Sequence, residues 1–254
     1  MFVRSLLVCA GVLLSVAPTL TMSADLAFAK VSTKIVSFPI GDPTNSIDVG
    51  PLADSLTGMD FDPAANVLWA INFTTQTVGT VNQSTGAYTS SAMLQGGCCI
   101  TAFTIDPVAG TFYVSKGDQD VYSLDRVSGE TILQGFGSPA GTSIAALAFD
   151  CSGRLFALAG NGTDLPNLYQ AHLGVGNPVL IGTPGYSGPT SLEFDNRSGV
   201  LYAWFLPPGG GNTTSTHVTI DTATGLATPI AQLDGRYRMA IRNECSIFAD
   251  DFEA

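Results

Sequence analysis

The sequence predicts an all-β fold, a β-propeller assembled from repeats of about 44 residues. A strand that ends in Asp recurs four times, with the aspartates at positions 62, 106, 150 and 195, which are 44, 44 and 45 residues apart. Apolar runs in each copy are separated by turns containing Gly or Asn, which indicates β-hairpins. After residue 30, no segment keeps apolar residues at helical period between capping residues. Together these observations favour blades of antiparallel strands.

Each repeat opens with a hairpin. Its first strand ends at an Asp that can cap the turn amides, and a following Gly or Asn tolerates positive φ. The second strand carries an aromatic residue. The four first strands read Met59-Asp60-Phe61-Asp62, Phe103-Thr104-Ile105-Asp106, Leu147-Ala148-Phe149-Asp150 and Leu192-Glu193-Phe194-Asp195.

A third and a fourth strand complete each repeat. They meet at a second turn that ends in Gly, as in Ser84-Thr85-Gly86, Val127-Ser128-Gly129 and Ala223-Thr224-Gly225. Four antiparallel strands form one propeller blade.

The two ends of the chain predict a fifth, shared blade. Met239–Ile241 and Ser246–Ala249 resemble the first two strands of a repeat, and Lys34–Phe38 and Ser46–Val49 resemble the last two. Neither half can bury its apolar face alone, so joining them closes the ring. We therefore expect five four-stranded blades within residues 30–249, with the closing blade shared between the N- and C-terminal segments.

The first residues predict export. Arg4 precedes an apolar run that is too short for a comfortable bilayer span, and Ala27-Phe28-Ala29 is a small-x-small cleavage motif. We predict a secretory signal over residues 1–29, cleaved after Ala29 or, as the second choice, after Ala24. The protein would then be secreted or periplasmic, and no later stretch is long enough to span a membrane.

The negative net charge of the chain limits which classes of partner it can bind. The net charge is −11 with only ten Lys and Arg, which speaks against nucleic acid and anionic membranes as partners. We expect a monomer that binds a protein, peptide or glycan on one face of the ring. His172 and His217 are expected at the surface or rim, because no nucleophile motif accompanies them.

Four cysteines remain after the predicted signal, and an exported chain favours disulfides. A bond between the neighbours Cys98 and Cys99 would need a strained ring. We therefore expect each of them to bridge to Cys151 and Cys245.

Residues 34 to 249, through these repeats, resemble the exported propellers of the NHL, YVTN and quinoprotein-like repeat class. The resemblance implies a fold and no particular chemistry. The Gly-His and Trp-Asp pairs of WD repeats and a tryptophan docking signature are missing. The acidic, aromatic end of the chain, residues 250–254 and the few before them, resembles a C-terminal sorting tail of exported bacterial proteins, and it can equally be a strand with a frayed acidic end.

A candidate axial site follows from aligning the innermost strands. One position reads Asp60, Thr104, Ala148, Glu193 and Ala240 across the five copies, and Arg238 lies two residues before the last. Buried carboxylates need a partner. One interpretation is an ion-pair network that fixes the blades, and the other is an axial ligand or metal site of a hydrolase or lyase.

Metal ligands are otherwise sparse. Asp118 and Asp120 offer oxygen ligands that suit calcium, but they do not match the 12-residue calcium loop. Such pairs more often cap turn amides. We expect no cofactor, with calcium as the one alternative.

Overall fold

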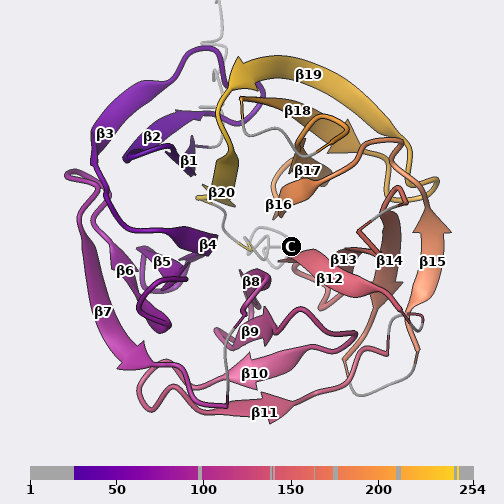
Figure 1. The fold of residues 1–254 in the computed structure, drawn as a ribbon, viewed down its shortest axis with the longest axis horizontal. Helices are drawn as coiled ribbons and strands as arrows, with labels where there is room; N and C mark the ends of the chain where they lie inside the picture. Colours follow the sequence, from indigo (N-terminus) through magenta and orange to yellow (C-terminus); the bar gives the residue numbers. More distant parts are fainter. Residues whose placement is uncertain are drawn as a thin grey trace, which may run out of the picture.

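Five four-stranded antiparallel sheets form a ring, which confirms the predicted five-bladed propeller. The structure, a computed structural model, describes residues 26–96, 99–137, 139, 141–162, 164–173, 177–209, 213–242 and 245. Viewed down the ring axis, the innermost strands β4, β8, β12, β16 and β20 surround the centre (Figure 1). Among the described residues, no helix is both long and apolar enough to cross a membrane.

The blades are numbered from the N-terminus, and each is given with its strands in order from the axis outward. Blade 1 contains β20 (Tyr237–Ile241), β1 (Leu26–Val31), β2 (Lys34–Pro39) and β3 (Ile47–Pro51). Blade 2 contains β4 (Leu56–Asp62), β5 (Val67–Asn72), β6 (Thr77–Val81) and β7 (Tyr88–Met93). Blade 3 contains β8 (Ala102–Ile105), β9 (Phe112–Ser115), β10 (Tyr122–Leu124) and β11 (Thr131–Leu133). Blade 4 contains β12 (Ser143–Phe149), β13 (Leu155–Gly160), β14 (Asn167–Ala171) and β15 (Val179–Gly182). Blade 5 contains β16 (Pro189–Asp195), β17 (Val200–Phe205), β18 (Thr214–Ile220) and β19 (Ala227–Asp234).

Blade 1 is the shared blade, but its strands are divided differently from the prediction. The C-terminal segment supplies only β20, and the N-terminal segment supplies the other three strands. Strand β1 takes the second place, pairing with β2 on one side and β20 on the other. The expectation that Ser246–Ala249 would form the second strand is therefore wrong, and those four residues lie outside the described ones.

The predicted turn chemistry is present in both turns of the repeat. In the first turn, the Asp106 carboxylate accepts from the amides of Val108 and Ala109 at 2.8 and 3.0 Å. In the second turn, Asp125 accepts from Val127 and Ser128 at 2.7 and 3.0 Å. Gly86, Gly129 and Gly225 at the end of these second turns have φ of 73°, 76° and 77°, which only glycine adopts readily.

The core lies between the blades. Each of five apolar clusters joins side chains from two neighbouring blades, so that the ring buries both faces of every sheet. An aromatic stack seals blade 5 against blade 1: the Trp204 ring lies 4.1 Å from Tyr237 and 4.5 Å from His217 between ring centroids. The closing blade is therefore joined to blade 5 by a buried aromatic stack.

Glycines let the outer strands touch the next blade. A Cβ on Gly50 of β3 would collide with the Thr85 carbonyl in the second turn of blade 2, and one on Gly182 of β15 would collide with the Thr224 carbonyl in blade 5. These close backbone approaches fix the distance between neighbouring blades at the rim.

A disulfide joins Cys151 to Cys245, with 5.6 Å between their Cα atoms, across 94 residues of sequence. The expected bridges from these two residues to Cys98 and Cys99 are therefore wrong. Cys99 is itself disulfide-bonded, and Cys98 lies outside the described residues. A disulfide that closes so long a loop lowers the conformational entropy of the unfolded chain. In the chain-entropy model this stabilises the folded state by about 4–5 kcal/mol.

Candidate functional site

The innermost strands all run from one face of the ring to the other. Their first residues, such as Leu56 and Pro189, line a pocket of about 590 Å³ that is open to solvent. Their last residues approach the opposite face, where Phe61, Ile105 and Ile241 line a cavity of about 10 Å³. We call the first the mouth pocket and the second the floor cavity.

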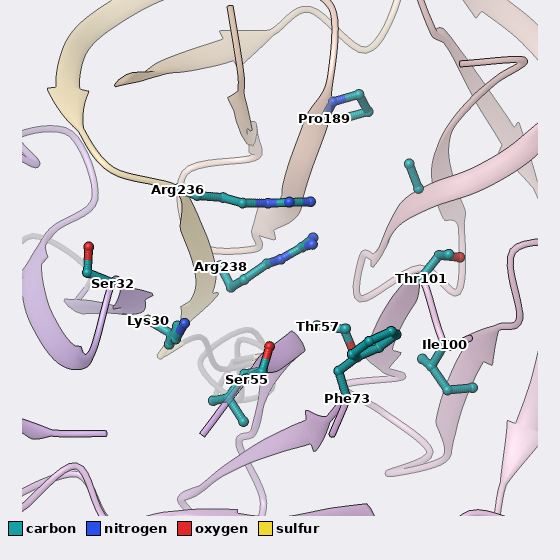
Figure 2. A pocket seen from close by; sticks show the side chains of 12 residues that line it. Lys30, Ser32, Ser55, Thr57, Phe73, Ile100, Thr101, Pro189, Arg236 and Arg238 are labelled. Carbon is teal, nitrogen blue, oxygen red and sulfur yellow. The ribbon is translucent and has the colours of Figure 1, made fainter. Parts of the chain in front are cut away.

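Three kinds of side chain line the mouth pocket. Apolar groups come from Leu56, Phe73, Ile100, Ala145 and Pro189. Hydroxyls come from Ser32, Ser55, Thr57 and Thr101. Three cations, Lys30, Arg236 and Arg238, complete the wall. The Arg236 and Arg238 side chains extend in the same direction into the pocket, with Ile100 and Thr101 on the opposite side (Figure 2).

All three cations come from the ends of the chain, where blade 1 closes the ring. Lys30 of β1 pairs in register with Arg238 of β20, and Arg236 lies in the loop just before β20. Cross-strand neighbours share one face of a sheet, so their charges lie close together. Ring closure therefore assembles this cluster from residues about 200 positions apart in the sequence.

Burial and mutual repulsion both act on these cations. Burial, followed by the charges of Arg238 and Arg236, lowers the pKa of Lys30. Burial, followed by the charge of Arg236, lowers the pKa of Arg238 to about 9. Arg238 thus keeps its proton at neutral pH, and its Nη1 donates to the Thr190 carbonyl at 2.5 Å.

Asp60, the first acid of the candidate axial site, is buried at the floor cavity. Its carboxylate accepts from the amides of Phe61 and Ile105, both at 2.6 Å, and from the Thr104 hydroxyl at 3.0 Å. Burial nevertheless raises the pKa of Asp60 to about 6. Its oxygens are occupied in joining β4 to β8.

Glu193 lies in the same cavity and is also buried. Burial, followed by the charge of Asp60, raises the pKa of Glu193 well above its usual value, although the Ile241 amide donates to it. Asp60, Thr104 and Glu193 are therefore brought together as the alignment suggested. Arg238 lines a small cavity of about 20 Å³ together with Glu193, but it forms no ion pair with either acid among the described residues.

The Asp118 and Asp120 oxygens hold the local chain. Asp118 accepts from the Tyr122 hydroxyl at 2.7 Å, and this bond raises the pKa of Tyr122 to about 12. Asp120 accepts from the amides of Phe136 and Gly137, both at 3.1 Å. Within the described ranges, no three His, Cys, Asp or Glu side chains are grouped as metal ligands would be.

The two histidines have different environments. His172 is exposed, as expected, but His217 is fully buried, so its predicted place at the rim is wrong. The His217 Nε2–H donates to the Ile40 carbonyl at 3.0 Å. Burial lowers the pKa of His217 to about 4, so this ring is a neutral part of the aromatic stack.

Sequence reasoning missed Lys30 and Arg236. Lys30 directly follows the predicted cleavage motif, so the sequence did not indicate that it lies in a strand. Arg236 lies in a loop, which has no repeat pattern. The signal that could have found them is the small number of cations in the chain. Arg236 and Arg238 are two of only ten Lys and Arg, and they lie together at the start of one strand.

No family model and no curated protein sequence matches the chain. Solved structures do match, and 756 of their chains resemble this fold. One belongs to the crystal structure of a nidogen/laminin complex, with a TM-score of 0.57 and 16% identity over 87% of this chain and 99% of that chain. Another is TolB from Acinetobacter baumannii, with a TM-score of 0.53 and 11% identity over 87% of this chain and 67% of that chain. Identities this low show a shared propeller fold alone.

Proposed function

We propose that the protein is an exported, non-catalytic module that binds a protein, peptide or glycan partner at its mouth pocket. The observation that carries this proposal is the pocket itself. It is open, measures about 590 Å³ and combines an apolar wall with polar groups that point inward, as binding sites do. In the part of the chain that the structure describes, its lining contains no carboxylate, histidine or cysteine that could act as base or nucleophile.

Two further observations support the proposal. The Cys151–Cys245 disulfide is typical of proteins outside the reducing cytosol. The nidogen/laminin complex contains a propeller of the same overall fold in an assembly with another protein. Both fit an exported propeller that uses one face for recognition.

A pull-down from the exported protein fraction tests the proposal. The immobilised wild type should retain a partner, and Phe73→Ser should lose it, because Phe73 is 47% exposed and lines the pocket. Lys34→Gln is the matched control, since Lys34 is exposed, pairs with Asp48 and does not line the pocket. Retention of no partner by the wild type over a range of salt concentrations would contradict the proposal, and equal loss in both variants would exclude the mouth pocket as the binding site.

A hydrolase or lyase that uses Asp60 and Glu193 is the second candidate. The pKa of about 6 for Asp60 favours it, because such a group can exchange protons near neutral pH. The floor cavity of about 10 Å³ holds one water at most, so a substrate would have to open it. Asp60→Asn and Glu193→Gln should leave a folded protein, and loss of activity against lactones, esters or glycans in both variants would favour the enzyme.

A further inference from the structure

Positive charge gathers at the mouth of a strongly acidic chain. The net charge is −11, yet three of the ten Lys and Arg meet in one pocket that no carboxylate of the described residues lines. The ion pairs found among the described residues belong to Lys34, Arg126 and Arg154 instead. The acid nearest to Arg236 along the chain, Asp234, forms no ion pair with it among the described residues. Asp54, next to Ser55 of the pocket, accepts from the Asn72 amide at 2.6 Å. Among the described residues, the cluster therefore has no ion-pair partner.

The polar groups of the pocket are mainly hydrogen-bond donors. Lysine and arginine side chains can only donate hydrogen bonds. The Arg238 Nη1 atom already donates one, to the Thr190 carbonyl. The Thr57 hydroxyl oxygen is buried and has no partner among the described residues, although it lines the pocket. A fitting ligand must supply acceptors, and carboxylate and phosphate oxygens are the strongest partners for arginine.

The charge of that ligand follows from the repulsion within the cluster. Lys30 and Arg238 are partly buried, and each lies close enough to another cation to be destabilised by it. A ligand with a single negative charge would leave most of this repulsion in place. A ligand with two or more negative charges would relieve it.

We propose that the mouth pocket is a specific site for oxyanions that carry at least two negative charges. The proposal rests on the proposed binding function of the same pocket and names the chemistry of its ligand. The anionic groups would face Lys30, Arg236 and Arg238, and the carbon skeleton would pack on Phe73 and Ile100 across the pocket. The source of such groups is either an acidic peptide segment of a partner or a free polycarboxylate or phosphate.

Calorimetric titration of the full exported chain tests the site at constant ionic strength. The probes are tri-glutamate peptide, citrate, inorganic phosphate and acetate. We expect the multivalent probes to bind and acetate to bind at least about tenfold more weakly, because it meets fewer of the cations. Arg236→Gln and Lys30→Gln should each weaken tri-glutamate and citrate by about tenfold or more. Lys34→Gln removes the same charge from the same blade outside the pocket, and it should change affinity by less than about twofold.

The outcomes distinguish source and site. Tri-glutamate binding tighter than citrate identifies an acidic segment of a partner, and citrate or phosphate binding at least as tightly identifies a free anion. Failure of every multivalent probe to bind, or an equal loss of affinity in Arg236→Gln and Lys34→Gln, overturns the site.

Thermal unfolding is the folding control for Arg236→Gln. Since Arg236 is exposed, we expect this variant to unfold like the wild type, which shows that its loss of affinity is local. A partner that Arg236→Gln retains but Phe73→Ser loses would keep the proposed function and overturn the oxyanion site.

Discussion

At the scale of single residues, the mouth pocket and the floor cavity contain side chains of opposite charge, and these side chains differ in burial and in hydrogen-bond partners. The floor acids Asp60 and Glu193 are enclosed, and backbone amides donate to both. The mouth cations line a pocket that is open to solvent, and they have no carboxylate partner among the described residues. The floor acids are thus partnered within the fold, whereas the mouth cations are available to the oxyanion that we propose as their ligand.

The floor acids should make stability depend on pH. A carboxyl whose folded pKa is raised holds a proton that the unfolded chain releases, so the stability of the fold decreases as pH rises from the unfolded pKa through the folded one. For Asp60, a rise from 3.8 to about 6 corresponds to a loss of about 3 kcal/mol above pH 6. The pKa of Glu193 is raised further by the Asp60 charge.

Glu193→Gln removes one of these acids and keeps an oxygen that can accept from the Ile241 amide. We expect its melting temperature to exceed that of the wild type by an amount that grows as pH rises from 4.5 to 8. Thermal unfolding across that range measures it. His217, whose lowered pKa has the opposite effect below pH 6.5, is common to both proteins and cancels in the difference. Glu130→Gln, at an exposed site, is the control and should show no such growth; a constant difference for Glu193→Gln would refute the assignment.

At the scale of elements, contacts between a strand and the next blade set the geometry of the ring. The outer strand β15 lies against the second turn of blade 5 at Gly182, where there is no room for a Cβ. The same contact recurs at Gly50 of β3. Blade spacing therefore depends on two or three glycines as well as on the apolar core.

Gly182→Ala tests this contact. The added methyl would meet the Thr224 carbonyl, so the backbone must move, and we expect a loss of about 1–3 kcal/mol. Urea unfolding gives the value. Gly41→Ala is the control, because nothing lies within 4 Å of its Cβ position. Equal stability of the two variants would show that the blades do not meet closely at Gly182.

The N-terminal strand also carries a prediction about processing. Cleavage after Ala29 would remove most of β1, which pairs with both β2 and β20, whereas cleavage after Ala24 leaves it whole. We therefore expect mass spectrometry of the exported protein to find Ala24 as the processing site. A chain that begins at residue 30 should unfold at a markedly lower temperature, because it lacks four of the six residues of β1, which bridges β2 and β20 in the closing blade. Identical melting of the two chains would contradict this division of blade 1.

The repeat made the fold predictable from the sequence, but features that lie outside the repeat could not be predicted in the same way. Alternating strands and Asp-capped turns are local, so four blades and their turns could be inferred from spacing alone. Ala27-Phe28-Ala29 fits both a cleavage motif and an apolar strand, and the pairing of these residues with β20 is a long-range contact that no local pattern contains. Arg238 lines a small cavity together with Glu193, as its place near the axial acids predicts, but it forms no ion pair with either acid among the described residues.

The disulfide error has a similar cause. Cys151 and Cys245 both follow the floor ends of innermost strands, β12 and β20, whereas Cys99 precedes the mouth end of β8. Strand direction, which the repeat alignment contains, therefore separates these cysteines to opposite faces. The expectation had weighed only the strain of neighbouring cysteines.

At the scale of the whole molecule, ring closure and binding depend on the same blade. Blade 1 joins the ends of the described chain and contributes Lys30, Arg236 and Arg238 to the mouth pocket. The Cys151–Cys245 bond fixes the chain beyond β20 to blade 4. A recognition site built this way exists only in the closed ring, so folding and binding should be lost together when β1 or β20 is removed.

Hydrogen–deuterium exchange of the full-length protein, with and without saturating tri-glutamate, tests whether the mouth pocket binds an acidic ligand. We expect slower exchange at the mouth, in the segments around residues 55–57, 73, 99–101 and 236–238, and unchanged exchange in the floor turns around residues 106–110 and 150–153. Protection confined to the floor turns or to the outer strands, with the mouth segments unchanged, would contradict this expectation.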